Sequence, residues 1–240
     1  MRISSRLAAK SRRRKQARPA TKARNMSCRT ATSCSSSLIP DGFELPFAQF
    51  ATSKLIFYIM PMGMPEIRFR FSPEKARTAL HWMLTQQSPL DLHTLLKACY
   101  FADKYHLNRH LRPIFGARYK AMNYGPVPLE IYELAKSEPL IIAELQDRIV
   151  PWELEGYRLK LKGNAAPNMD ILSRSDILAL EEGFSLSRSM NFTDRTAATH
   201  GRDWERANFG MMDYADMLDN GPDQSAKVRE LRETARYAVL

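Results

Sequence analysis

The chain has few cysteines and no long hydrophobic run. Its 240 residues include three cysteines, of which Cys28 and Cys34 lie near the N-terminus and Cys99 lies in an apolar stretch. This count offers no disulfide framework and suits a reducing cytoplasm. The most apolar window, residues 55–64, is interrupted by Pro61, whereas a membrane helix needs about 20 apolar residues. We therefore expect a cytoplasmic protein without a transmembrane helix.

Acidic residues are almost absent from the first quarter of the chain. Residues 1–60 hold twelve Lys or Arg against Asp41 and Glu44, which accounts for the whole formal charge of +10. Residues 61–240 therefore hold 24 basic and 24 acidic side chains. A basic patch is the usual mark of a nucleic-acid partner. Its absence from residues 61–240 leads us to expect no nucleic-acid binding by the folded domain.

The basic segment has the composition of a tail. Residues 1–37 are rich in Arg, Lys, Ser, Thr and Ala and have no apolar period, so they bury too little surface to offset the entropy of ordering. We expect residues 1–63 to be a disordered leader, or a stretch upstream of the true start, for which Met60, Met62 and Met64 are candidates. The composition also resembles a transit peptide. Residues 64–240 are the predicted domain.

Helix starts and turns can be read along this domain. Ser72 with Pro73 opens a helix to about residue 87, and Ser88, Pro89 and Asp91 predict a second helix to about residue 108. The proline and glycine spacing after it predicts turns and short strands up to residue 128. Further predicted elements are helices at 129–136, 139–148, 173–189, 202–207 and 225–239 and a hairpin at 152–161. The expected fold is a single compact helical domain, mainly α with a small β-hairpin component (α+β).

One run carries most of the information, LLKACYFADKYHLNRHLRPIFGARYKAMNYGPVPLEIYELAK at residues 95–136. It resembles the Panacea domain of the SocA-like antitoxin family. The matching positions are Leu95, Leu96, Tyr100, Phe101, Ala102, Asp103, Tyr105, His106, Leu107, Arg112, Pro113, Ile114, Gly116, Tyr119, Ala121, Met122, 124–128, Ile131, Tyr132 and Leu134. His200 and Trp204 fit a weaker C-terminal pattern. Two positions depart from it, because Leu111 replaces a common Gly and Ala117 a common Asp.

The resemblance implies an antitoxin that neutralises a cognate protein toxin by direct binding. The toxin is expected to be encoded by the adjacent gene. In the SocA-like branch, neutralisation includes delivery of the toxin to an AAA+ protease such as ClpXP. The candidate partner-binding or motif residues are Tyr100, Asp103, His106, Arg112, Pro113, Arg118, Tyr119, Met122, Tyr124, Gly125, Pro126, Pro128, Tyr132, His200 and Trp204. No membrane partner and no cofactor are expected.

The four tyrosines of the run have two interpretations. Tyr100, Tyr119, Tyr124 and Tyr132 form either an aromatic partner-binding set or a half-buried part of the core.

Asp103 and His106 stand three residues apart on one helical face. They fit an acid–base pair, or a structural pair that closes the helix against the Arg112 loop. Asp103 can equally pair with Arg112 or Arg118.

The sequence shows no recognisable set of catalytic residues. His106 and His110 have the separation of zincin ligands, but the glutamate of that motif is absent. Cys99 lies in an apolar stripe, and no Gly-x-Ser-x-Gly elbow or phosphate-binding glycine loop occurs. We therefore predict no metal site and no enzyme. Two alternatives stay open: a nucleic-acid-binding transcriptional regulator or phage-associated protein that uses the basic tail, and an enzyme built on Asp103, His106 and His200.

Overall fold

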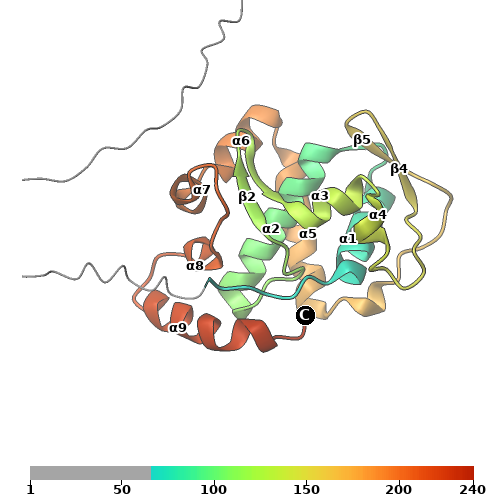
Figure 1. Ribbon diagram of the computed structural model, residues 1–240. Coiled ribbons are helices and arrows are strands. Elements are labelled where there is room, and N and C mark those ends of the chain that lie inside the picture. Colours follow the sequence, from blue (N-terminus) through green and yellow to red (C-terminus); the bar gives the residue numbers. More distant parts are fainter. Residues whose placement is uncertain (1–65) are drawn as a thin grey trace, which may run out of the picture. The chain divides into compact units, whose positions relative to one another are not determined.

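The computed structural model describes residues 66–240 (Figure 1). The predicted leader at residues 1–63 and the candidate start methionines Met60, Met62 and Met64 lie outside the described residues. Within residues 66–240, no helix is both long and apolar enough to cross a membrane.

Helices supply most of the described fold. The α-helices are α1 (Pro73–Gln86), α2 (Leu92–His110), α3 (Leu129–Ala135), α4 (Pro139–Ile142), α5 (Arg174–Ser189), α6 (Phe192–Thr199), α7 (Arg202–Ala207), α8 (Tyr214–Met217) and α9 (Gln224–Thr234). Two 3-10 turns, η1 (Met169–Ile171) and η2 (Ala235–Tyr237), complete the set.

Within residues 66–240, five short strands form two small antiparallel sheets. Strands β1 (Leu90–Asp91), β4 (Trp152–Glu155) and β5 (Arg158–Leu161) make a sheet in the order β1-β5-β4. Strands β2 (Tyr119–Met122) and β3 (Gly125–Pro128) pair as a hairpin, with Tyr119 opposite Pro128 and Met122 opposite Gly125. The observed fold is therefore the predicted α+β class.

Helix α2 is the centre of the domain, because twelve of its nineteen residues are buried. A helix that is buried nearly all round must be covered by other elements on every side. Helix α5 packs along it at close range, since a Cβ on Gly183 would lie 2.6 Å from the Ala102 nitrogen and 2.7 Å from the Ala98 oxygen. Small residues on both helices therefore bring the two backbones together.

Two apolar clusters flank α2. The first, which includes Leu95, Cys99 and Trp152, joins α1, α3 and α5 to the hairpin β4–β5. The second, which includes Tyr100 and Leu231, joins α2 to α8 and α9. In the view of Figure 1, the β4–β5 hairpin lies on one side of α2. Helices α7 and α8 lie on the other side, and α9 lies below.

Most predicted elements are confirmed. Helices α1, α3, α5 and α7, both strands of the β4–β5 hairpin and the start of α9 lie within two residues of the predicted positions, and β2 and β3 lie in the region where turns and short strands were predicted. Ser173 and Asp176 form the predicted capping box of α5. Pro128 is the N-cap of α3, as expected.

Two predictions about elements were wrong, and two helices were missed. The Ser88–Asp91 capping pattern is not used, because residues 90–91 pair with β5 and Asp91 itself caps α2 through the Thr94 nitrogen. Helix α4 ends at Ile142, well before residue 148. Helices α6 and α8 were not predicted, although Asn191 caps α6 through the nitrogen of Asp194.

Candidate functional site

A hollow of about 550 Å³ lies where the β2–β3 hairpin meets the beginnings of α2 and α6. We call it the Tyr124 hollow. Its lining residues are Asp91, Leu92, His93, Leu96, Lys97, Met122, Tyr124, Gly125, Val127, Tyr132, Tyr157 and Phe192. Aromatic and aliphatic side chains predominate, and four of the predicted site residues are among them.

Exposed aromatic side chains surround this hollow. Tyr124 is 61% exposed, Tyr157 85% and Phe192 49%. The rings of Tyr124 and Phe192 meet edge to face with centroids 5.3 Å apart. The Leu92 nitrogen donates to the Tyr157 oxygen at 2.8 Å, which ties the β4–β5 turn to the start of α2. Clustered apolar exposure of this kind marks an interaction surface.

The turn between β2 and β3 depends on glycine. Gly125 has φ +90°, a conformation that L side chains rarely adopt. A Cβ at this position would overlap Thr199 Oγ1 and lie 3.1 Å from Lys97 Nζ. Helix α6 and helix α2 therefore approach the turn so closely that only glycine fits.

Positive charge is buried next to the Tyr124 hollow. Lys97 is 1% exposed, and its Nζ donates to the Pro126 oxygen at 2.7 Å. Arg195 of α6 is 6% exposed, and its Nη1 lies 3.0 Å from His93 Nδ1. Burial, with a contribution from Lys97, lowers the pKa of His93 to about 4. His93 is therefore neutral at physiological pH, and the basic groups beside it are Lys97 and Arg195.

Asp103 anchors the loop after α2. Its Oδ1 accepts the backbone N–H groups of Ile114 and Phe115 at 2.7 and 3.1 Å, and its Oδ2 accepts the Tyr119 hydroxyl at 2.9 Å. Burial raises the pKa of Asp103 to about 7, although these three donors act to lower it. The carboxyl group is fully buried and its oxygens are occupied. The predicted pairing of Asp103 with Arg112 or Arg118 was wrong, because buried backbone N–H groups take its oxygens instead.

His106 closes the same loop from a separate position. Its Nδ1 lies 2.7 Å from the Arg112 oxygen, to which it donates, and its Nε2 lies 3.0 Å from Ser175 Oγ. Asp103 and His106 therefore do not pair with each other. Each of them instead forms its own hydrogen bonds to the loop, so the expected closure of α2 against the Arg112 loop is present but the expected pair is not.

A buried carboxylate on α5 completes this network. Asp176 receives Lys75 Nζ at 2.6 Å and Arg112 at 3.0 Å, and its Oδ1 lies 3.2 Å from His106 Nε2. Helix α1, the loop after α2 and helix α5 are joined through this one side chain. Despite its burial the pKa of Asp176 is lowered, because Lys75, the Ser173 backbone and Arg112 stabilise the charged form. Arg112 thus has a structural partner in Asp176.

The four tyrosines divide between the two interpretations. Tyr100 and Tyr119 are each 1% exposed; the Tyr100 hydroxyl donates to Asp203 and the Tyr119 hydroxyl to Asp103. They belong to the core. Tyr124 is exposed and Tyr132 half-buried, and both line the Tyr124 hollow. Among the prolines, Pro113, Pro126 and Pro128 are buried and shape the backbone of the loop and hairpin.

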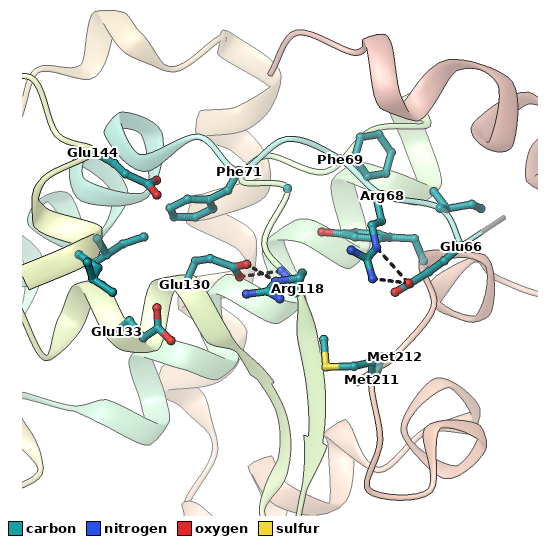
Figure 2. Close-up of a pocket in the computed structure, with 15 residues that line it drawn as sticks. Glu66, Arg68, Phe69, Phe71, Arg118, Glu130, Glu133, Glu144, Met211 and Met212 are labelled. Carbon is teal, nitrogen blue, oxygen red and sulfur yellow. Dashed lines mark hydrogen bonds and ion pairs between the residues drawn. The ribbon is translucent and has the colours of Figure 1, made fainter. Parts of the chain in front are cut away.

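Arg118 lies in a different, acidic groove of about 390 Å³ (Figure 2). Its guanidinium donates to Glu130 at 2.6 Å, and Figure 2 shows the pair in the middle of the groove, with Glu133 and Glu144 to one side. The Arg68–Glu66 ion pair, at 2.7 Å, lies at the other end. The lining also includes Gly116 and hydrophobic side chains, namely Ile67, Phe69, Phe71, Leu140, Ile141, Met211, Met212 and Tyr214.

His200 and Trp204 stack on each other with ring centroids 3.8 Å apart. The indole N–H of Trp204 donates to the Met122 oxygen at 2.9 Å, which ties α7 to the β2–β3 hairpin. Burial and the charge of Lys97 lower the pKa of His200. His200 shares no described contact partner with Asp103 or His106.

The two departures from the family pattern have structural explanations. Leu111 is the C-cap of α2 and has φ 50°, ψ 30°, in the left-handed region where glycine is favoured. Ala117 is fully buried, and its oxygen accepts the Tyr214 hydroxyl at 2.7 Å. The nearby Glu130 supplies a carboxylate to the backbone N–H of Arg118 at 2.8 Å.

Cysteine and metal chemistry find little support among residues 66–240. Cys99 is fully buried, and burial raises the pKa of its thiol. The rings of His106 and His110 lie 4.5 Å apart. Within the described part of the chain, no group of three or more His, Cys, Asp or Glu is arranged to hold a metal ion.

Sequence reasoning did not place eight of the twelve lining residues among the candidate site residues, among them His93, Lys97, Tyr157 and Phe192. Lys97 had a visible signal, because it is a charged residue inside the apolar run at 95–99. Phe192 was missed together with helix α6, whose capping pair, Asn191 and Asp194, was the available signal.

A comparison with protein families identifies the class of this fold. An α+β domain with a central buried helix and a proline-bounded hairpin carries the motif, and residues 95–205 match the family described as antitoxin SocA-like, Panacea domain. Residues 95–205 are thus similar to a SocA-like Panacea domain, as predicted, and the match supports an antitoxin role in general. All fifteen predicted site residues lie within it. Searches of curated proteins and of solved structures gave no match.

The neutral state of His106 makes a pH-dependent prediction. Burial lowers the pKa of His106 from 6.5 to about 4, so between these values the unfolded chain binds a proton that the folded chain does not. His106 therefore stabilises the fold above pH 6.5, and this contribution is lost as the pH falls towards 4. The difference in free energy of unfolding between wild type and His106→Gln should shrink by on the order of 2 kcal/mol from pH 7.5 to 4.5.

The measurement is urea denaturation at both pH values. Asp103 and His93 titrate in both proteins, so their effects cancel in the difference. His110→Gln, which removes the exposed histidine whose ring lies 4.5 Å from that of His106, measures how much of the pH dependence this neighbour contributes. A difference for His106→Gln that is independent of pH would contradict the neutral assignment.

Proposed function

We propose that this protein neutralises a cognate protein toxin by direct binding, and that the toxin docks on the Tyr124 hollow. The observation that carries the proposal is the group of exposed aromatic side chains, Tyr124, Tyr157 and Phe192, around a hollow that is lined in part by residues of the family motif. Tyrosine and other aromatics dominate the energetics of protein interfaces because they offer large, stiff contact areas. The SocA-like match supports an antitoxin role.

We also propose that the protein is not an enzyme. The oxygens of Asp103 and both ring nitrogens of His106 have structural partners. A general acid or base needs a free position facing the substrate. The buried Cys99 offers no thiolate nucleophile, because its pKa is raised.

The proposed encounter takes place in the cytoplasm with the product of the adjacent gene. Binding is the required step, and delivery of the toxin to a ClpXP-type protease is a step that can follow it. The half-life of the toxin, in cells with and without the protease, separates blocking from delivery. An unchanged half-life in the presence of the antitoxin supports blocking alone.

Coexpression tests the function. The adjacent open reading frame is induced alone and together with the full chain, and growth is measured. We expect growth arrest by the product alone and restored growth with the full chain. A product that is harmless alone, or that stays toxic in the presence of the full chain, would overturn the proposal.

Tyr124→Ala tests the docking surface in the same assay. Loss of an exposed aromatic anchor at the centre of an interface should weaken toxin binding about tenfold or more, so rescue should fail at low antitoxin expression. The matched control is Tyr237→Ala, which removes another exposed tyrosine, 75% exposed and outside the hollow. Thermal unfolding of both variants should equal that of wild type. Equal rescue by Tyr124→Ala and Tyr237→Ala would place the toxin elsewhere.

A further inference from the structure

Lys97 is a buried basic side chain that has no anionic partner among residues 66–240. Its side chain is 1% exposed, and its Nζ makes one described hydrogen bond, to the Pro126 oxygen. Within residues 66–240 it takes part in no ion pair closer than 4.0 Å. An ammonium group carries three N–H donors, so the Pro126 bond leaves capacity for further acceptors.

The groups around Lys97 add to the free-energy cost of holding a positive charge on its side chain. Arg195 on α6 is buried as well, and His93 and His200 lie close enough for Lys97 to lower the pKa of each. Asp91 provides a carboxylate 3.9 Å from Arg195 Nη1, but its oxygens accept the Thr94 nitrogen and hydroxyl. Burial, followed by repulsion from Arg195, lowers the pKa of Lys97 to about 7. An unpaired buried charge is expensive, and the lowered pKa reflects that expense.

Arg195 is less available to a docking partner than Lys97 is. Its Nε donates to the Ser187 oxygen at 2.8 Å and its Nη2 to the Met190 oxygen at 2.6 Å. These bonds satisfy carbonyl groups at the end of α5. Arg195 is therefore committed to the fold, whereas Lys97 lines the hollow with donor capacity to spare.

We propose that Lys97 is the anion-binding group of the Tyr124 hollow, and that the docking partner presents an Asp or Glu side chain next to an aromatic one. This inference rests on the proposed function and adds the chemistry of the partner segment. The carboxylate forms an ion pair with Lys97, and the aromatic ring packs against Tyr124 and Phe192. The partner's carboxylate supplies the missing negative charge, and the ion pair is strong because the local dielectric is low. A partner without this carboxylate leaves the Lys97 ammonium uncompensated, so the ion pair favours the correct partner.

Two blocked dipeptides test the inference on the full chain without the toxin. Acetyl-Glu-Phe-amide and acetyl-Gln-Phe-amide differ in charge and hardly in shape. With ¹³C-labelled lysine, NMR follows the Lys97 Cε resonance as each peptide is added and as the pH is varied. We expect the Glu peptide to bind at least tenfold more tightly than the Gln peptide and to raise the pKa of Lys97 by at least one unit. Equal affinities, or an unchanged pKa with saturating Glu peptide, would overturn the inference.

Lys97→Met supplies a second arm. This substitution keeps an unbranched side chain that is one atom shorter and removes its charge, so the preference for the Glu peptide should disappear. If the variant does not fold, the comparison of the two peptides on wild type still decides. A preference that persists in a folded Lys97→Met protein would assign the anion site to another residue.

The outcomes separate this inference from the proposed function. If Tyr124→Ala abolishes neutralisation but the two peptides bind wild type alike, the anion site fails and the docking surface stands. If the peptides discriminate but Tyr124→Ala still neutralises the toxin, the docking surface fails and the anion site of the hollow stands.

Discussion

Asp103→Ala should be among the most destabilising single substitutions in the domain. The change removes the acceptor of two buried backbone N–H groups, those of Ile114 and Phe115, and of the Tyr119 hydroxyl. A buried donor left without an acceptor costs about 1–3 kcal/mol. We expect a loss of about 3 kcal/mol or more and a fall in melting temperature of roughly 10 °C, measured by denaturation and calorimetry.

Asp103→Asn is the matched control for this prediction. The amide oxygen can still accept the two backbone N–H groups, and the amide nitrogen can donate to the Tyr119 hydroxyl oxygen. Its cost should therefore be about 1 kcal/mol. Neutralisation by Asp103→Asn should match wild type. Loss of neutralisation in an Asp103→Asn protein that stays folded would show that the carboxylate acts in function and not only in the fold.

Gly125→Ala should be comparably costly for a steric reason. The position has φ +90°, and a Cβ would overlap Thr199 Oγ1 and crowd Lys97 Nζ. Backbone strain and overlap together should cost about 2–4 kcal/mol. The hollow should be distorted as well, so we expect weaker neutralisation even at temperatures where the variant stays folded. Urea denaturation and the coexpression assay measure the two effects.

Gly156→Ala separates strain from crowding. Gly156 also has a positive φ, +62°, but nothing lies within 4 Å of its Cβ position. Its substitution should cost only about 1 kcal/mol. The double variant Gly125→Ala with Thr199→Ala should recover the part of the loss caused by the Oγ1 overlap. Equal losses for Gly125→Ala and Gly156→Ala would mean that close approach does not dictate glycine at position 125.

Local signals in the sequence predicted most of the helix boundaries. Ser173 with Asp176 and the proline at Pro73 fix helix starts by satisfying or omitting N–H groups that the first turn leaves unpaired. The capping pattern at residues 88–91 predicted a helix start that the structure does not have. Residues 90 and 91 pair with β5 as a strand, so they are not available for the first turn of a helix. Tertiary hydrogen bonding overrode a correct local preference there.

The site was harder to predict than the helices. Its motif residues were found, but the Tyr124 hollow is assembled from α2, the β2–β3 hairpin, the β4–β5 turn and α6, which are distant in sequence. The partners of Asp103 show the same limit, since the sequence offered two arginines and the fold supplied two backbone N–H groups. A buried loop contains backbone N–H groups that need hydrogen-bond acceptors, and the spacing of residues in the sequence does not show which side chains supply them.

The central claim is that a partner protein docks on the Tyr124 hollow, and a binding isotherm measures this directly. The purified product of the adjacent gene is titrated into the full chain, into a Tyr124→Ala/Phe192→Ala double variant and into Tyr237→Ala. We predict a dissociation constant for the double variant raised about a hundredfold, with Tyr237→Ala unchanged. Equal dissociation constants for the wild type and the folded double variant would contradict the account.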